Sequence, residues 1–157
     1  MSSIADNIGS VTRRIQKATL KAGRDPGSVR LLAVSKTRPP EDLRAAFEAG
    51  QKAFGENYLQ EALDKIGALD DLDGIEWHFI GPIQSNKTRQ IAEAFAWVHS
   101  VDRLKIARRL SEQRPESLPA LNICLQVNIN NEDSKSGCTL DELPELVSAI
   151  SDLPNIS

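Results

Sequence analysis

Residues 31–40, LLAVSKTRPP, lead from an apolar run into a single lysine and then into two prolines. The apolar run, over residues 29–34, predicts a strand of a parallel sheet that is buried on both faces. Lys36 stands at the end of this strand, before a turn. Pro40 opens a helix because proline and acidic residues favour the first helical turn, and Gly50 ends it. The stretch therefore predicts one strand–turn–helix unit with an amine at the strand end.

The same unit recurs along the chain. An amphipathic helix over residues 4–22, ended by Gly23, comes first. The further predicted units are strand 53–57 with a helix to residue 69, strand 75–81 with helix 85–95, strand 97–102 with a helix to residue 113, and strand 121–129 with helix 139–153. In the last unit, Thr139 and Glu142 have the spacing of a capping box. The strand ends lie about 20 to 26 residues apart, which is the period of one βα unit.

Strands joined by helices pair in parallel with right-handed crossovers, so the candidates are a doubly wound open sheet and a (β/α)8 barrel. The turn over residues 35–39 lacks the glycine-rich phosphate fingerprint of dinucleotide folds, which favours the barrel within the α/β class. Eight units take about 250 residues in a typical barrel. Residues 1–157 supply five units of one barrel domain, and residues 155–157 approach a sixth strand. We therefore expect this single domain to be incomplete at its C-terminus.

The charge and the cysteines argue against several classes of protein. A formal net charge of -3 gives no electrostatic reason to expect nucleic acid or an acidic membrane surface as a partner. Two cysteines without CxxC spacing, and no leader-like segment at the start, predict a reducing, cytoplasmic location. Because the sequence has two histidines and no clustered cysteines, no dedicated metal site is expected.

Lys36 is the candidate for covalent chemistry. The reactive face of a βα barrel lies at the carboxyl ends of its strands, where Lys36 is predicted. Burial in an apolar barrel mouth lowers the pKa of an amine, and a neutral amine attacks a carbonyl to form an imine. The alternative is a lysine that extends its charge to solvent from the strand end, or pairs with an acid across the barrel. The residues alone leave both interpretations open.

Five motifs follow the predicted strand ends in order. They are AVSKT at residues 33–37, FGENYLQE at 54–61, EWHFIGPIQSNK at 76–87, HSVD at 99–102 and VNINNEDSKSG at 127–137. This series resembles the pyridoxal phosphate homeostasis protein family, which consists of single-domain barrels similar to the N-terminal domain of alanine racemase. The resemblance extends from the first helix to the last residue.

The resemblance implies a cofactor and the residues that bind it. Lys36 matches the lysine of the family's AVSKT motif and is expected to form a covalent Schiff base with pyridoxal 5′-phosphate. Asn57, in the GEN motif, is expected to lie close to the cofactor ring. His78 shares a strand face with Glu76 and either points toward the ring or is a hydrogen-bonded barrel histidine. In the family, the groups that bind the phosphate come from the last strands.

The resemblance also implies a role. Such proteins hold pyridoxal 5′-phosphate and supply it within vitamin B6 homeostasis without established catalytic turnover. Transient contacts with pyridoxal-phosphate-dependent apoenzymes are therefore expected, as is a monomer or a weak homodimer. The rival is a pyridoxal-phosphate-dependent racemase or decarboxylase of related fold. A Schiff-base aldolase that uses Lys36 directly, and an inert barrel with a buried lysine, are the remaining alternatives.

Overall fold

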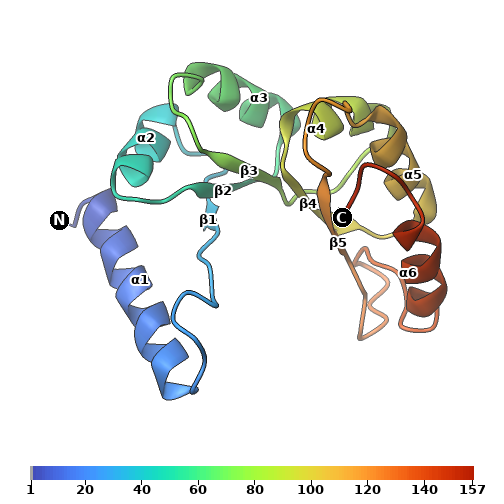
Figure 1. Cartoon of the computed structure of the whole chain (residues 1–157), viewed down its shortest axis with the longest axis horizontal. Coiled ribbons are helices and arrows are strands. Elements are labelled where there is room, and N and C mark those ends of the chain that lie inside the picture. Colours follow the sequence, from blue (N-terminus) through green and yellow to red (C-terminus); the bar gives the residue numbers. More distant parts are fainter. Residues whose placement is uncertain (1) are drawn as a thin grey trace. The chain divides into compact units, whose positions relative to one another are not determined.

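The computed structural model describes residues 2–157 (Figure 1). The chain forms two compact units. The first unit comprises residues 2–55 and 60–75, and the second comprises residues 56–59 and 76–157. Asn57 therefore belongs to the second unit, whereas Lys36 belongs to the first.

The first unit contains the N-terminal helix and the first two strands. Its elements along the chain are α1 (Ile4–Lys21), β1 (Ala33–Val34), α2 (Pro40–Glu48), most of β2 (Ala53–Glu56) and most of α3 (Leu59–Ala68). The two strands pair in parallel, with Ala33 opposite Phe54 and Val34 opposite Gly55. The parallel strand–helix–strand order predicted from the sequence is confirmed in this unit.

The helix boundaries of the first unit follow the residues that predicted them. Ser3 and Asp6 form a capping box at the start of α1, with each backbone N–H donating to the other side chain at 3.1 Å. Gly23 follows α1 with a φ of 68°. Pro40 is the first residue of α2, and Gly50 follows its end with a φ of 101°. Glycine adopts such positive φ angles without a steric penalty, so a helix can end there without backbone strain.

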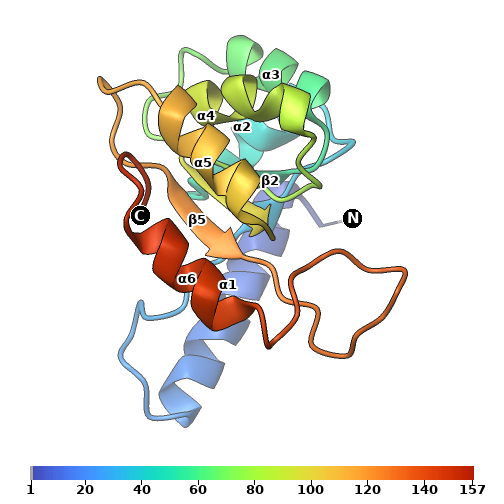
Figure 2. The same ribbon diagram turned by 90° about the vertical axis from the view of Figure 1, so that its right-hand side faces the viewer.

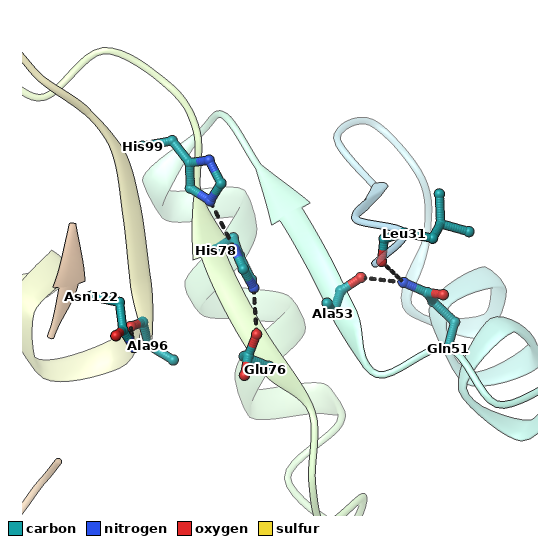
Figure 3. A network of polar contacts seen from close by, with 8 residues as sticks. All are labelled: Leu31, Gln51, Ala53, Glu76, His78, Ala96, His99 and Asn122. Carbon is teal, nitrogen blue, oxygen red and sulfur yellow. Dashed lines mark hydrogen bonds and ion pairs between the residues drawn. The ribbon is translucent and has the colours of Figure 1, made fainter. Parts of the chain in front are cut away.

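The strand predicted over residues 29–34 is wrong in extent and in burial. β1 is limited to two residues, and Val34 is 52% exposed. Gln51 gives a physical reason, because its Nε2 donates to the carbonyl of Leu31 at 2.8 Å and to the carbonyl of Ala53 at 2.7 Å (Figure 3). The Leu31 carbonyl thus bonds to a side-chain amide instead of to the backbone of a neighbouring strand, and strand β1 does not extend to Leu31.

The second unit continues the βα repeat. Its elements are β3 (Glu76–Phe79), the 3-10 helix η1 (Ser85–Lys87), α4 (Thr88–Ala94), β4 (Trp97–Val101), α5 (Leu104–Gln113), β5 (Asn122–Leu125) and α6 (Leu143–Ser151). The three strands are parallel neighbours in chain order, with His78 opposite Trp97 and Val98 opposite Ile123. An irregularity between Val98 and Val101 shifts the register of the second pair.

The core of the second unit lies between its strands and helices α4 and α5. Phe79 and Val98 are buried, and the rings of Phe79 and Phe95 meet edge to face at 5.3 Å. Ile106 and Leu110 are one helical turn apart on α5 and are also buried. Figure 2 shows α4 and α5 side by side and α6 near α5. Apolar residues at strand and helix periods thus pack one face of these strands.

The last strand is shorter than the predicted 121–129. β5 ends at Leu125, and the chain beyond it pairs with the following loop. The N–H of Cys138 donates to the carbonyl of Gln126 at 2.9 Å, and the N–H of Asn128 donates to the carbonyl of Cys138 at 2.8 Å. The predicted approach of residues 155–157 to the sheet is confirmed, because Leu121 and Ile156 form a parallel bridge.

The helix predicted over residues 139–153 also begins later than expected. Thr139 and Glu142 interact, but the Thr139 hydroxyl accepts from the Glu142 N–H at 3.2 Å ahead of α6, which starts at Leu143. The pair therefore closes a turn before the helix instead of capping it. Between residues 2 and 157, no helix has the length and apolar character that crossing a membrane requires.

Candidate functional site

Lys36 lies in a tight turn directly after β1. The N–H of Arg38 donates to the carbonyl of Ser35 at 3.1 Å, so Lys36 and Thr37 are the two central residues of a β-turn. Thr37 has a φ of 64°. Turns with a positive φ at the second central residue usually place glycine or asparagine there, and a β-branched residue in this region is strained. Something outside the turn must therefore stabilise Thr37.

Two residues of α3, Glu61 and Lys65, supply that stabilisation. The Thr37 N–H donates to Oε1 of Glu61 at 2.5 Å, and Nζ of Lys65 lies 2.9 Å from the same oxygen. Lys65 Nζ also donates to the carbonyl of Ser35 at 2.6 Å. The pKa of Glu61 is lowered from 4.5, chiefly by the hydrogen bond from Lys65. The hydrogen bond from the Thr37 N–H and the charge of Lys65 also lower this pKa, and the three effects together outweigh burial, which raises it. Glu61 is consequently a carboxylate at neutral pH.

The predicted burial of Lys36 is not what the structure shows. Lys36 is exposed, as is Val34 two residues before it, whereas Ser35 between them is buried. This alternation is that of a strand covered on one face only. Lys36, in the turn that follows, is exposed to solvent, and the desolvated amine expected from the sequence is absent in the part of the chain that the structure describes.

Asn57 follows β2 and lies in the second unit. Its Oδ1 is buried and has no hydrogen-bond partner among residues 2–157. Gly81 packs against the same residue so closely that a Cβ atom on Gly81 would lie 2.2 Å from the Asn57 carbonyl oxygen. The backbone of Asn57 is thus held by close packing, while its side-chain oxygen is an acceptor that lacks a donor.

His78 is the centre of a three-residue chain of polar contacts in the second unit (Figure 3). Its Nε2 lies 2.7 Å from Oε1 of Glu76, and its Nδ1 lies 2.8 Å from Nε2 of His99. With both rings neutral, the bond to the carboxylate assigns the His78 proton to Nε2, and His99 then donates from its own Nε2. The His78 ring also stacks on Trp97 with an interplanar angle of 3°. The predicted placement of His78 on the same face as Glu76 is confirmed.

We expect the free energy of unfolding to fall as the pH is lowered from about 8 to about 5. Burial, and then the charge that His78 carries when it is protonated, lowers the pKa of His99 from 6.5. The unfolded chain binds a proton at a higher pH than the folded chain does, so stability is full above pH 6.5 and declines below it. Denaturant unfolding at several pH values measures this, and His99→Gln should flatten the profile. A profile identical in the variant would contradict the assignment.

The structure thus describes Asn57 and His78 in the second unit and Lys36 in the first. Sequence reasoning missed Glu61 and Lys65. The two residues are four apart on one face of a predicted helix. This spacing indicates an ion pair on the helix surface, but it gives no sign that the pair contacts the turn after β1.

These features define a parallel βα-repeat domain with an amine at the end of its first strand, and comparisons with known proteins place it more closely. Residues 6–157 match the family model described as alanine racemase, N-terminal domain. The pyridoxal phosphate homeostasis protein of Pseudomonas aeruginosa is 64% identical over 156 residues, which cover 99% of this chain and 67% of the relative. The protein of the same description from Escherichia coli K12 is 51% identical, with 99% and 68% covered. The chain therefore belongs to the alanine racemase N-terminal domain family and, within it, to the pyridoxal phosphate homeostasis proteins.

Solved structures agree with this assignment. PipY of Synechococcus elongatus, in its structure with pyridoxal phosphate bound, is 38% identical, with a TM-score of 0.78 and coverage of 91% of this chain and 66% of PipY. Alanine racemase from Corynebacterium glutamicum is 19% identical, with a TM-score of 0.65 and coverage of 97% of this chain and 42% of the racemase. At this identity, the similarity shows the fold alone. The predicted fold is confirmed: the chain carries the N-terminal helix and five βα units of a (β/α)8 barrel of the alanine racemase N-terminal type. The chain spans about two thirds of the length of its homeostasis relatives.

Proposed function

We propose that this chain binds pyridoxal 5′-phosphate through a reversible Schiff base at Lys36 and acts in vitamin B6 homeostasis as a carrier of the cofactor. The observation that carries the proposal is Lys36 itself, an exposed amine at the carboxyl end of β1, in a protein that is 64% identical to a pyridoxal phosphate homeostasis protein. The structure of the relative PipY with pyridoxal phosphate bound adds support.

The residues present fit this cofactor. Lys36 is accessible, as an amine that exchanges a bound aldehyde with other molecules must be. The partnerless Oδ1 of Asn57 is an acceptor suited to a donor such as the hydroxyl group on the cofactor ring. We propose Asn57 as a ring contact on this ground. Binding by His78 remains a prediction, and since both of its nitrogens are bonded within the protein, its contact would be through the ring face.

The chemistry at Lys36 is a condensation. When bound, pyridoxal 5′-phosphate would supply an aldehyde, and Lys36 would supply the nitrogen that adds to it, with loss of one water molecule. The reaction needs no oxidant or reductant and is reversed by water or by another amine. This chain contributes the nucleophilic nitrogen and the turn that presents it.

The test is to trap the adduct on the unmodified chain. Titration with pyridoxal 5′-phosphate should produce the visible absorbance of a protonated imine, and borohydride should reduce the imine to a stable amine that peptide mapping places on Lys36. The Pseudomonas aeruginosa relative, treated in the same way, is the control for the method. No adduct, or an adduct on other lysines only, would refute the proposal.

We propose that the protein has no turnover of its own, in keeping with the descriptions of its relatives. A racemase or decarboxylase of related fold would instead convert amino acids, and racemisation or carbon dioxide release measured after loading distinguishes the two. We also propose a cytoplasmic location, which fits the free thiols Cys124 and Cys138. The proposal further includes transient contact with apoenzymes, and a monomer or weak homodimer as the oligomeric state.

A further inference from the structure

We propose that Glu61 and Lys65 are positioning residues for Lys36: together they fix the backbone on both sides of the reactive lysine. This inference rests on the proposed function, because it concerns how Lys36 is presented to an aldehyde. We call the two side chains and their contacts to Ser35 and Thr37 the turn clamp. All four residues belong to the first unit.

The burial of Lys65 is the first observation. Lys65 is 3% exposed, and lysine is almost never buried to this extent unless its charge is paired. Its Nζ lies 2.9 Å from Glu61 and donates to the Ser35 carbonyl at 2.6 Å. Stability alone does not explain a buried ammonium group, because apolar residues that replace a buried ion pair often leave a protein equally or more stable. The specific contact to Ser35 therefore suggests a geometric role.

The residue before Lys36 is held from two directions. The Ser35 N–H donates to the carbonyl of Gly55 on the neighbouring strand at 2.9 Å. The Ser35 carbonyl accepts from Lys65 and from the N–H of Arg38, which closes the turn. Both polar backbone groups of Ser35 are thus bonded, which holds the peptide planes on the two sides of its Cα atom.

The residue after Lys36 is held by the other half of the turn clamp. Thr37 has a φ of 64°, a conformation that a β-branched residue adopts only when its surroundings enforce it. The Thr37 N–H donates to Glu61, and the Thr37 hydroxyl donates to the carbonyl of Lys36 at 2.6 Å. Glu61 is kept in place by its ion pair with Lys65. The strain at Thr37 is therefore balanced by a charge-assisted hydrogen bond.

Fixing both neighbours fixes the direction of the Cα–Cβ bond of Lys36, while its side chain remains exposed. An amine whose starting direction is set loses less conformational freedom when it forms a covalent bond. The turn clamp should therefore increase the equilibrium constant for Schiff-base formation without touching the cofactor. No contact of either Glu61 or Lys65 with the cofactor is needed.

The experiment compares four variants of the whole chain. Glu61→Ala removes both bonds of the carboxylate, Glu61→Gln keeps a neutral acceptor for Thr37, and Lys65→Met keeps the buried stem without the charge. The control is Asp71→Ala, which breaks the ion pair of Asp71 with Arg44, a pair of 2.8 Å in the same unit that joins α2 to the segment after α3. The readouts are the Lys36 adduct with pyridoxal 5′-phosphate and the hydrogen exchange of the Thr37 amide.

We expect Glu61→Ala to lower the equilibrium constant for adduct formation at least about tenfold and to speed hydrogen exchange of the Thr37 amide by a similar factor. This is the factor that corresponds to the loss of one charge-assisted hydrogen bond. Glu61→Gln should fall between Glu61→Ala and the unmodified chain. Asp71→Ala should change neither readout. Glu61→Gln keeps the test decisive if Lys65→Met does not fold.

Two results would overturn the inference. One is adduct formation and Thr37 exchange unchanged in Glu61→Ala; the other is an equal loss in Asp71→Ala, which would reveal general destabilisation. If the unmodified chain forms no adduct at Lys36, the proposed function fails, and the Thr37 exchange rates alone then decide whether the turn clamp exists.

Discussion

Replacing Lys36 by alanine should abolish the borohydride-reducible adduct with pyridoxal 5′-phosphate and change the free energy of unfolding by no more than about 0.5 kcal/mol. The chemical loss is complete because alanine has no nucleophile. The small structural effect follows from the exposure of Lys36, whose removal opens no cavity. Absorbance, reduction and peptide mapping give the first quantity, and denaturant unfolding gives the second.

Lys52→Ala is the matched control for that experiment. Lys52 is another exposed lysine of the first unit, and its Nζ lies 4.2 Å from the centre of the Phe47 ring. Its replacement should leave the adduct intact. An adduct that persists at the same peptide in Lys36→Ala would show that another amine carries the chemistry, and the assignment of Lys36 would then be wrong.

Gly81→Ala should lower the free energy of unfolding by about 1 to 3 kcal/mol, the range for forcing an extra methyl group into a packed site. The new Cβ would lie 2.2 Å from the carbonyl oxygen of Asn57 and 2.9 Å from its carbonyl carbon. Because both contacts are to backbone, relief requires the chain at Asn57 to move. Cofactor binding should weaken with it, which urea unfolding and the pyridoxal 5′-phosphate titration measure together.

Gly67→Ala tests the same substitution without the clash. A Cβ on Gly67 meets nothing within 4 Å, and this residue lies inside α3, where alanine is favoured over glycine by about 0.5 to 1 kcal/mol. We therefore expect Gly67→Ala to stabilise the protein slightly. A Gly81→Ala variant as stable as Gly67→Ala would disprove the close approach at Asn57.

Much of the fold follows from local patterns in the sequence. The helices that begin at Ile4 and Pro40 are set by the Ser3 cap, by the proline itself and by glycines with positive φ, all of which act over a few residues. The short β1 could not be predicted, because Gln51 bonds the Leu31 carbonyl from 20 residues away. Apolar composition indicates that a segment suits a strand, but pairing depends on which groups meet in space.

The candidate site was predictable in one respect and not in another. Lys36, Asn57 and His78 were found through motifs, since each follows or lies in a recognisable strand. The positive φ of Thr37 and its bond to Glu61 were hidden, because threonine does not signal a left-handed residue and Glu61 lies on a different element. Sequence patterns identify reactive groups more readily than the contacts that orient them.

The order of strand pairing has a consequence for how the protein is made. Within each unit, every strand of the ladders pairs with the next strand along the chain, as Ala33 does with Phe54 and His78 with Trp97. One α-helix lies between each two paired strands, with the 3-10 helix η1 also preceding α4, so the loop to be closed is short and its closure costs little entropy. A ribosome releases these segments in that same order. Each βα step can therefore be completed during translation, with the Lys36 turn among the first parts to acquire its partners.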